Sequence, residues 1–100
     1  MNGRQAVRVA RLYLSEREGQ VDALTASLRE AGLRGVTVLR GIAGFGEHGV
    51  LSARLLDLSL DLPVVVEFFD APEKVDAALA AVADRVPPGH LVVWDASTNL

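Results

Sequence analysis

Four glycines fall within nine residues directly after an apolar run: Gly41, Gly44, Gly46 and Gly49. Glycine spacing of this kind occurs in loops that hold a phosphate group. A P-loop, however, requires Lys and Ser or Thr after its last glycine, and Glu47 and His48 occupy those positions. The dinucleotide pattern GxGxxG must open a helix, whereas this segment leads toward another apolar run. The glycines are therefore expected to allow bends, positive φ angles and close backbone contacts at a strand end.

Other side chains in the chain offer little catalytic chemistry. His48 and His90 are the only histidines, and neither lies in a motif with the spacing of the three or four ligands that a metal site needs. There is no cysteine, and the serines show no nucleophile signature. We expect no catalytic residue, no metal, no cofactor and no enzyme activity. Arg40 either pairs with an anionic ligand or forms a surface ion pair. Phe45 either stacks on a planar ring or plugs a subunit interface.

Length and composition limit the class of protein. The chain has 100 residues, half of them hydrophobic, which predicts a single domain over residues 1–100. The net charge of −3 argues against nucleic-acid binding, which needs a basic surface. Arg8 and Arg11 interrupt the first apolar stretch and exclude a signal-peptide core. No apolar run reaches the roughly 20 residues of a membrane span. These features predict a cytoplasmic protein that is not embedded in a membrane.

Hydrophobic periodicity predicts an alternation of strands and helices. Alternating or β-branched runs predict strands at 6–14, 35–41, 62–69 and 90–94, and residues 95–100 are expected to form a polar tail. Apolar stripes with helical spacing begin at Val21 and Val75, and Asp70 and Glu73 are expected to cap the second helix. The order βαββαβ predicts an α+β ferredoxin-like sandwich, with a four-stranded antiparallel sheet and two helices on one face.

The third predicted strand is apolar on both faces, although helices can cover only one face of such a sheet. A bare second face would be a large exposed patch, so we expect an oligomer that buries it. Arg11 and Glu67 are the only charges in the middle of the two most apolar strands. Counting by alternation, they share a face with Tyr13 and Phe69. We expect these charges to pair inside an interface; the alternative is that each is solvated separately.

Three segments carry a further signal: "GLRGVTVLRGIAGFGEHG" from residue 32, "LLDLSLDLPVVVEFFD" from residue 55 and "EKVDAALAAV" from residue 73. With "RLYL" in the first strand, they resemble the PII-like signalling family called domain of unknown function 190. The resemblance runs from Arg8 to about Asp95. It implies a homotrimer with ligand clefts between subunits at the root of a T-loop, whose tip contacts a transporter, channel or enzyme.

The resemblance and the local chemistry together suggest two sets of residues. The ligand set lies at the loop root and comprises Arg40, Gly41, Gly44, Phe45, Gly46, Glu47 and His48. The interface set lies on the two apolar strands and comprises Arg11, Tyr13, Glu67 and Phe69.

Three departures from the nucleotide-binding PII pattern bear on the ligand. The loop before the last strand is only "PPGH", the last six residues lack Lys and Arg, and the T-loop is short, about residues 47–54. A small anionic ligand or nucleotide bound by a trimeric regulatory protein is the first expectation. The alternative is a ligand-free structural subunit that docks on a membrane transporter or channel.

Overall fold

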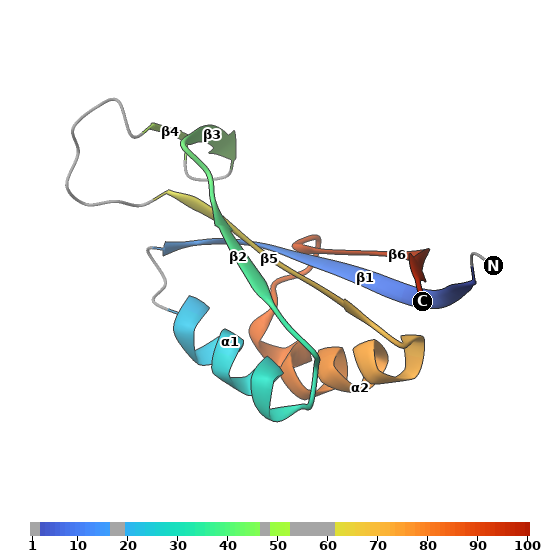
Figure 1. Ribbon diagram of the computed structural model, residues 1–100. Helices are drawn as coiled ribbons and strands as arrows, with labels where there is room; N and C mark the ends of the chain where they lie inside the picture. The colour runs from blue at the N-terminus through green and yellow to red at the C-terminus, as the bar shows by residue number, and fades with distance from the viewer. Residues whose placement is uncertain (1–2, 17–19, 47–48, 53–61) are drawn as a thin grey trace.

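The computed structural model describes residues 3–16, 20–46, 49–52 and 62–100 (Figure 1). Within these residues, six strands, two α-helices and one short 3₁₀ helix follow one another. In chain order they are β1 (Arg4–Ser15), α1 (Val21–Glu30), β2 (Thr37–Arg40), β3 (Ala43–Gly46), β4 (Gly49–Ser52), β5 (Pro63–Asp70), α2 (Pro72–Val82), η3 (Ala83–Arg85) and β6 (Leu91–Asn99).

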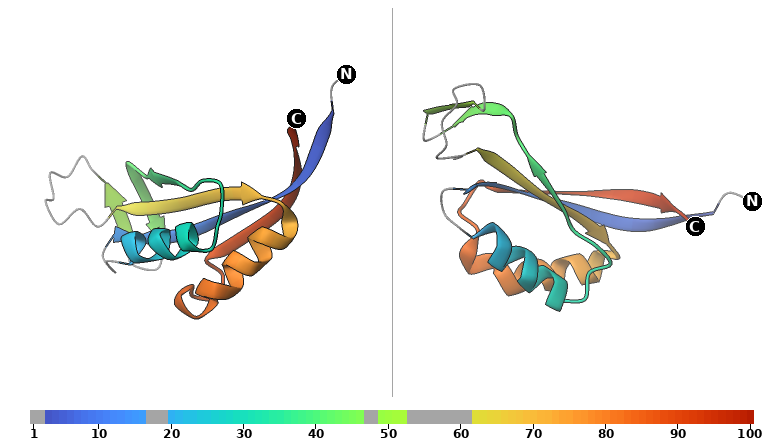
Figure 2. Two further views of the ribbon diagram at one scale, coloured as in Figure 1. Left: turned by 60° about the horizontal axis from the view of Figure 1, so that its bottom comes forward. Right: turned by 60° about the vertical axis from the view of Figure 1, so that its left-hand side comes forward.

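The main sheet has the strand order β2-β5-β1-β6, and each neighbouring pair is antiparallel. Helices α1 and α2 lie together on one face of this sheet, as Figures 1 and 2 show from three directions. The predicted ferredoxin-like sandwich is therefore confirmed. Its core lies between the layers, where Leu12 and Val66 of the sheet pack with Leu24 and Leu28 of α1 and Val75 of α2.

The ends of the helices follow local sequence signals in part. Gly32 follows α1 with a φ of 89°, the left-handed conformation expected after a helix. Pro72 occupies the first turn of α2, where its missing N–H costs nothing. The expected Asp70–Glu73 cap is wrong, because Ala71 is the N-cap residue and no side chain caps it.

Strand β6 is longer than expected, and the prediction of a polar tail at 95–100 is wrong. Asp95, Ala96 and Ser97 continue the antiparallel ladder opposite Arg8, Val7 and Ala6 of β1. β1 itself begins at Arg4, two residues earlier than expected. Residues 95–99 are a strand because their backbone pairs with β1, and their polar side chains give no sign of this pairing.

Strands β3 and β4 form a separate two-stranded hairpin inside the segment expected to be a loop. Ala43 lies opposite Ser52 and Gly46 opposite Gly49. Only residues 47 and 48 separate the two strands, and both lie outside the described residues. Within the described part of the chain, no helix is long and apolar enough to span a membrane.

Candidate functional site

The root of the glycine-rich segment packs closely against the start of β5. The N–H of Gly41 donates a hydrogen bond of 2.7 Å to the carbonyl oxygen of Pro63. A Cβ at residue 41 would lie 2.7 Å from Pro63 Cγ, closer than such atoms can approach, whereas one at residue 44 would lie at an ordinary 3.5 Å. The expected close backbone contact is therefore confirmed at Gly41. The expected positive φ is absent at Gly41 and Gly44.

Arg40, at the end of β2, is held by a carboxylate of its own chain. Arg40 Nε lies 2.7 Å from Oε1 of Glu16, and Arg40 Nη2 donates to Glu16 Oε2 at 2.8 Å. These hydrogen bonds raise the pKa of Arg40. Of the two alternatives for Arg40, the structure shows the ion pair. The sequence pattern does not indicate Glu16 as the partner, because Glu16 follows β1, which is not a neighbour of β2 in the sheet.

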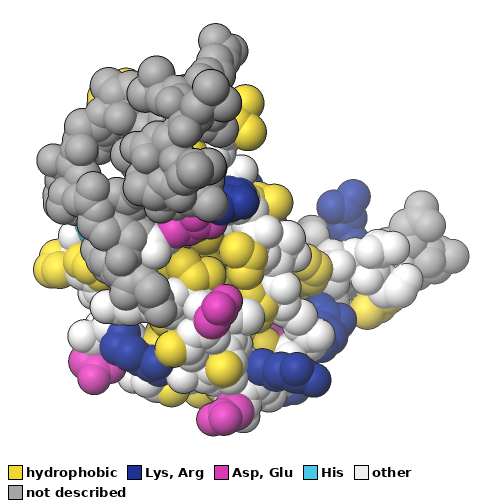
Figure 3. Space-filling view, turned by 90° about the vertical axis from the view of Figure 1, so that its left-hand side faces the viewer, with side chains coloured by type: hydrophobic (Ala, Val, Ile, Leu, Met, Phe, Trp, Pro, Cys, Tyr) yellow, Lys and Arg dark blue, Asp and Glu magenta, His cyan; other side chains and the backbone are white. Residues whose placement is uncertain are grey.

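A pocket of about 400 Å³ lies beside this ion pair. Glu16, Asp22 and Arg40 supply its charges, and Val21, Val38 and Val64 supply its apolar lining. Figure 3 views this side of the molecule and shows hydrophobic side chains in the middle with acidic and basic side chains around them. With Glu16 in place, the charged groups that line the pocket sum to one negative charge.

The segment beyond Arg40, at the start of the β3–β4 hairpin, exposes two large apolar side chains. Ile42 is 75% exposed and Phe45 is 89% exposed. Phe45 is therefore neither stacked nor buried within one chain. Glu47 and His48 of the expected ligand set lie outside the described residues. Among the described residues, no three His, Asp or Glu side chains gather closely enough to hold a metal ion.

The predicted charge pair on the sheet face away from the helices is present. Arg11 lies directly opposite Glu67 in the β1–β5 ladder, and Arg11 Nε donates to Glu67 Oε1 at 2.5 Å. Hydrogen bonds to Glu67 and then to Tyr13 raise the pKa of Arg11. The guanidinium also lies 5.8 Å from the centre of the Trp94 ring, within range of a cation–π interaction.

This face of the sheet, called the open face below, carries large apolar side chains that the chain does not cover. Its aromatic members are Tyr13, Phe69 and Trp94, which are 42%, 43% and 41% exposed. Val92 and Leu39 lie on the same face by register and are also exposed. The expected bare apolar face is therefore a feature of the chain, whereas its role as an interface stays a prediction.

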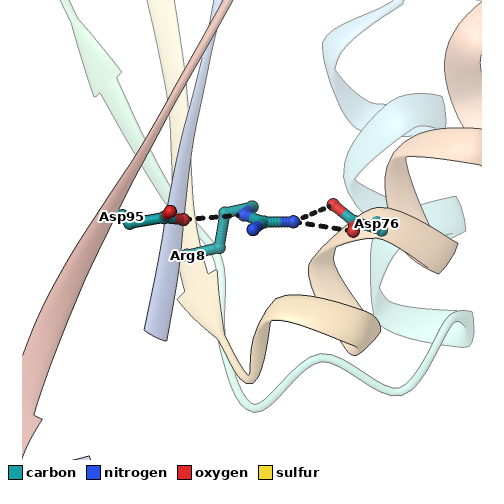
Figure 4. A network of polar contacts seen from close by, with 3 residues as sticks. All are labelled: Arg8, Asp76 and Asp95. Carbon is teal, nitrogen blue, oxygen red and sulfur yellow. Dashed lines mark hydrogen bonds and ion pairs between the residues drawn. The ribbon is translucent and has the colours of Figure 1, made fainter. Parts of the chain in front are cut away.

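A second charged network, which sequence analysis missed, ties β6 to α2 (Figure 4). Arg8 of β1 donates through Nε to Asp95 of β6 at 2.9 Å. Through Nη1, Arg8 also donates to both carboxylate oxygens of Asp76 in α2, at 2.8 and 2.7 Å. Hydrogen bonds to Asp76 and then to Asp95 raise the pKa of Arg8. Recognising residues 95–99 as a strand would have placed Arg8 opposite Asp95.

His90 connects the loop before β6 to β1. From the sequence, this residue was considered only as a possible metal ligand. The N–H of Tyr13 donates to the carbonyl oxygen of His90 at 2.8 Å. The Nδ1 atom of His90 lies 2.8 Å from the carbonyl oxygen of Tyr13. A second pocket of about 470 Å³ lies beside this loop, lined mostly by apolar residues of α2, η3 and the loop. His90 is therefore a structural tie between this loop and the sheet.

Comparison with protein families gives one match over most of the chain. The family model DUF190, described as an uncharacterized ACR, matches residues 9–98. A UPF0166 protein of Methanocaldococcus jannaschii is 29% identical over 91 residues, covering 86% of this chain and 84% of that protein. A UPF0166 protein of Aquifex aeolicus is 41% identical over 66 residues, covering 65% and 68% of the two chains.

Comparison with solved structures gives proteins of the PII type. CPII from Thiomonas intermedia K12, bound to ADP and bicarbonate, has a TM-score of 0.69 at 19% identity, covering 98% of this chain and 91% of that one. PII of Arabidopsis thaliana bound to citrate has a TM-score of 0.58 at 17% identity, covering 91% and 76%. At these identities the likeness establishes a shared fold.

Proposed function

Because the chain belongs to the DUF190 family and has the fold of PII proteins, we propose that it is a regulatory protein that assembles as a homotrimer. In this proposal it binds a small anionic ligand or nucleotide at the clefts between subunits and passes that signal to a protein partner. It acts in the cytoplasm and catalyses no reaction.

The open face is the single observation that carries the proposal. A chain of 100 residues that leaves Tyr13, Phe69 and Trp94 more than 40% exposed on one sheet face loses hydrophobic stabilisation unless another surface covers them. A second copy of the same face, repeated around a symmetry axis, covers it with matching chemistry. The Arg11–Glu67 pair then lies inside the assembly and has no uncompensated charge.

The ligand part of the proposal rests on Arg40 and the pocket beside it. A guanidinium binds planar oxyanions through two parallel hydrogen bonds. The CPII structure with ADP and bicarbonate shows the kinds of ligand that one protein of this fold accepts. In the free chain Glu16 binds the Nε and Nη2 side of the Arg40 guanidinium, so an anion either displaces Glu16 or binds the remaining N–H groups on the Nη1 side. We place the ligand at the root formed by Arg40, Gly41 and Gly44, with Glu47 and His48 nearby in sequence.

The partner part of the proposal rests on the β3–β4 hairpin. Among the described residues, Ile42 and Phe45 are the most exposed large apolar side chains near the loop root, and apolar anchors of this kind dominate protein interfaces. The same observation favours the second candidate function. In that case the protein is a ligand-free structural subunit, and the hairpin docks constitutively on a membrane transporter or channel.

Titration calorimetry with ADP, AMP and bicarbonate tests the ligand part. We expect saturable binding by the wild-type chain and binding weaker by roughly tenfold in Arg40→Gln, since one charge-assisted contact is worth about that factor. Arg29→Gln, which removes an exposed arginine of α1, is the matched control and should bind as the wild type does. Absence of binding to all three compounds would favour the ligand-free structural subunit.

A further inference from the structure

The ion pair between Arg40 and Glu16 has the geometry of a guanidinium with a bound oxyanion. Arg40 Nε lies 2.7 Å from Glu16 Oε1, and Arg40 Nη2 donates to Glu16 Oε2 at 2.8 Å. Two parallel hydrogen bonds of this kind are the arrangement in which arginine holds a carboxylate or a phosphate group. In the free chain, Glu16 therefore occupies the place on Arg40 that a ligand oxyanion would take.

Backbone hydrogen bonds to the start of β5 hold both partners of this ion pair in position. The N–H of Glu16 donates to the carbonyl oxygen of Leu62 at 3.2 Å. The N–H of Gly41, the residue after Arg40, donates to the carbonyl oxygen of Pro63 at 2.7 Å. Two successive carbonyl groups thus anchor the backbone beside both charged side chains. Because this backbone is already ordered, only side-chain freedom is lost when the ion pair forms.

The ion pair itself adds little to the stability of the fold. The side chains of Arg40 and Glu16 are 51% and 28% exposed. Exposed ion pairs contribute little stability, because water screens the attraction and two long side chains lose freedom. Breaking this pair is therefore expected to leave the chain folded, whether a ligand or a substitution breaks it.

The charges around the pocket oppose an incoming anion. Glu16 and Asp22 contribute two negative charges and Arg40 contributes one positive charge. A monovalent anion that enters while Glu16 stays on Arg40 raises the net negative charge from one to two, and like charges a few ångströms apart repel each other. An anion that displaces Glu16 must instead compete with a carboxylate whose backbone is already in place. In both cases Glu16 weakens the binding of the anion.

Asp22 allows the two effects, competition and repulsion, to be told apart. It is an acidic residue in the first turn of α1, and it lines the same pocket. Within the described part of the chain, Arg40 is paired with Glu16 and not with Asp22. Asp22 therefore adds the same charge to the pocket as Glu16 but leaves the N–H groups of Arg40 unoccupied.

We propose that Glu16 is an internal competitor for the anion site on Arg40 and sets the ligand concentration at which the protein responds. This inference rests on the proposed function, because it takes Arg40 as the residue that binds the ligand. The ligand anion takes over the hydrogen bonds of Nε and Nη2, and the Glu16 carboxylate moves into water. A free ligand also loses translational and rotational freedom on binding, whereas Glu16 does not. The internal carboxylate therefore keeps the site closed to ligands at low concentration.

Titration calorimetry with AMP and bicarbonate tests the competition. Glu16→Gln removes the charge and keeps the shape of the side chain, so we expect binding roughly tenfold tighter than in the wild type. Glu16→Asp keeps the charge on a side chain one methylene shorter, which cannot reach both nitrogens as Glu16 does, and should also bind more tightly. Asp22→Asn is the matched control. It removes the same charge from the same pocket and should change the affinity by less than about threefold.

Circular dichroism should show that the three variants remain folded. Equal affinities of Glu16→Gln and the wild type, or equal gains in Glu16→Gln and Asp22→Asn, would overturn the competition and leave the ligand site on Arg40 intact. If Glu16→Gln does not fold, Glu16→Asp decides, because an affinity equal to that of the wild type would show repulsion without competition. Absence of binding by the wild type and by every variant would overturn the proposed ligand site as well.

Discussion

The Arg11–Glu67 pair can show whether the open face is exposed to water or covered by another copy. Both side chains are about one-third exposed in the single chain, where ion pairs contribute little to stability. In the proposed assembly the pair would be desolvated, and removing one partner would leave a buried charge unpaired. We therefore predict that Glu67→Ala weakens trimer formation by roughly tenfold or more, measured by light scattering over a dilution series.

Two variants accompany this measurement. Glu30→Ala removes an exposed carboxylate from α1 and should leave assembly unchanged. Arg11→Met combined with Glu67→Leu removes both charges and should restore much of the lost affinity. Equal dissociation of Glu67→Ala and wild type would show that the pair stays solvated.

Asp70 makes the stability of the fold depend on pH. Burial raises the pKa of this carboxyl, but the N–H groups of Arg34 and Ala71 and the charges of Lys74 and Arg34 outweigh burial and lower it. Because the pKa of Asp70 is lower in the folded chain than in the unfolded chain, the ionised carboxylate stabilises the fold. This stabilisation is complete above the unfolded pKa of about 4 and is lost as the pH falls through the folded pKa.

We predict that Asp70→Asn lowers the free energy of unfolding at pH 7 by about 1–3 kcal/mol, because the two N–H groups bind different carboxylate oxygens and the NH₂ of an amide can accept neither. The difference from wild type should shrink as the pH falls below about 4. Urea unfolding at several pH values measures it. Asp84→Asn, at an exposed position of η3, is the control. A difference that is the same at every pH would contradict the role given to the Asp70 charge.

Residue partners were predictable only where topology makes two strands neighbours. Arg11 and Glu67 could be paired in advance because alternation fixes the face and the βαββαβ order fixes the neighbour. Glu16 follows the end of β1, which is not a neighbour of β2 in the sheet, so neither spacing nor periodicity indicates its contact with Arg40. The ion pair between Arg8 and Asp95 was not predicted, because the last strand was expected to end at Trp94, one residue before Asp95.

At the scale of elements, the contact between the end of β2 and the start of β5 depends on a glycine. We predict that Gly41→Ala lowers the free energy of unfolding by about 1–3 kcal/mol, since its Cβ would overlap the Pro63 ring and displace one strand. Gly44→Ala should have a smaller effect, because its Cβ makes only an ordinary contact with Pro63. Thermal unfolding compares the two.

Gly35→Ala is the control for this pair. Nothing lies within 4 Å of a Cβ at residue 35, and its φ is not positive, so the substitution should be neutral or stabilising. Equal stability of Gly41→Ala and Gly35→Ala would show that the β2–β5 contact adapts to a methyl group.

The central elements were predictable because burial gives them a periodic signal. β5 and both helices carry apolar residues at the spacing that their buried faces require. The β3–β4 hairpin and residues 95–99 of β6 lack such a signal. Polar side chains give residues 95–99 no apolar period, so only their backbone pairing with β1 makes them a strand. The glycine-rich composition of β3 likewise favours a loop over a strand by propensity alone.

At the scale of the whole molecule, Trp94 reports directly on the open face. It is the single tryptophan of the chain and is 41% exposed without a partner copy. Assembly through the open face transfers its ring from water to an apolar interface. We predict that its fluorescence emission shifts to longer wavelength on dilution, over the same concentration range in which light scattering falls from three chains to one. Glu67→Ala should move both transitions to higher concentration together. A particle mass that changes while the emission stays constant would place the subunit contact away from the open face.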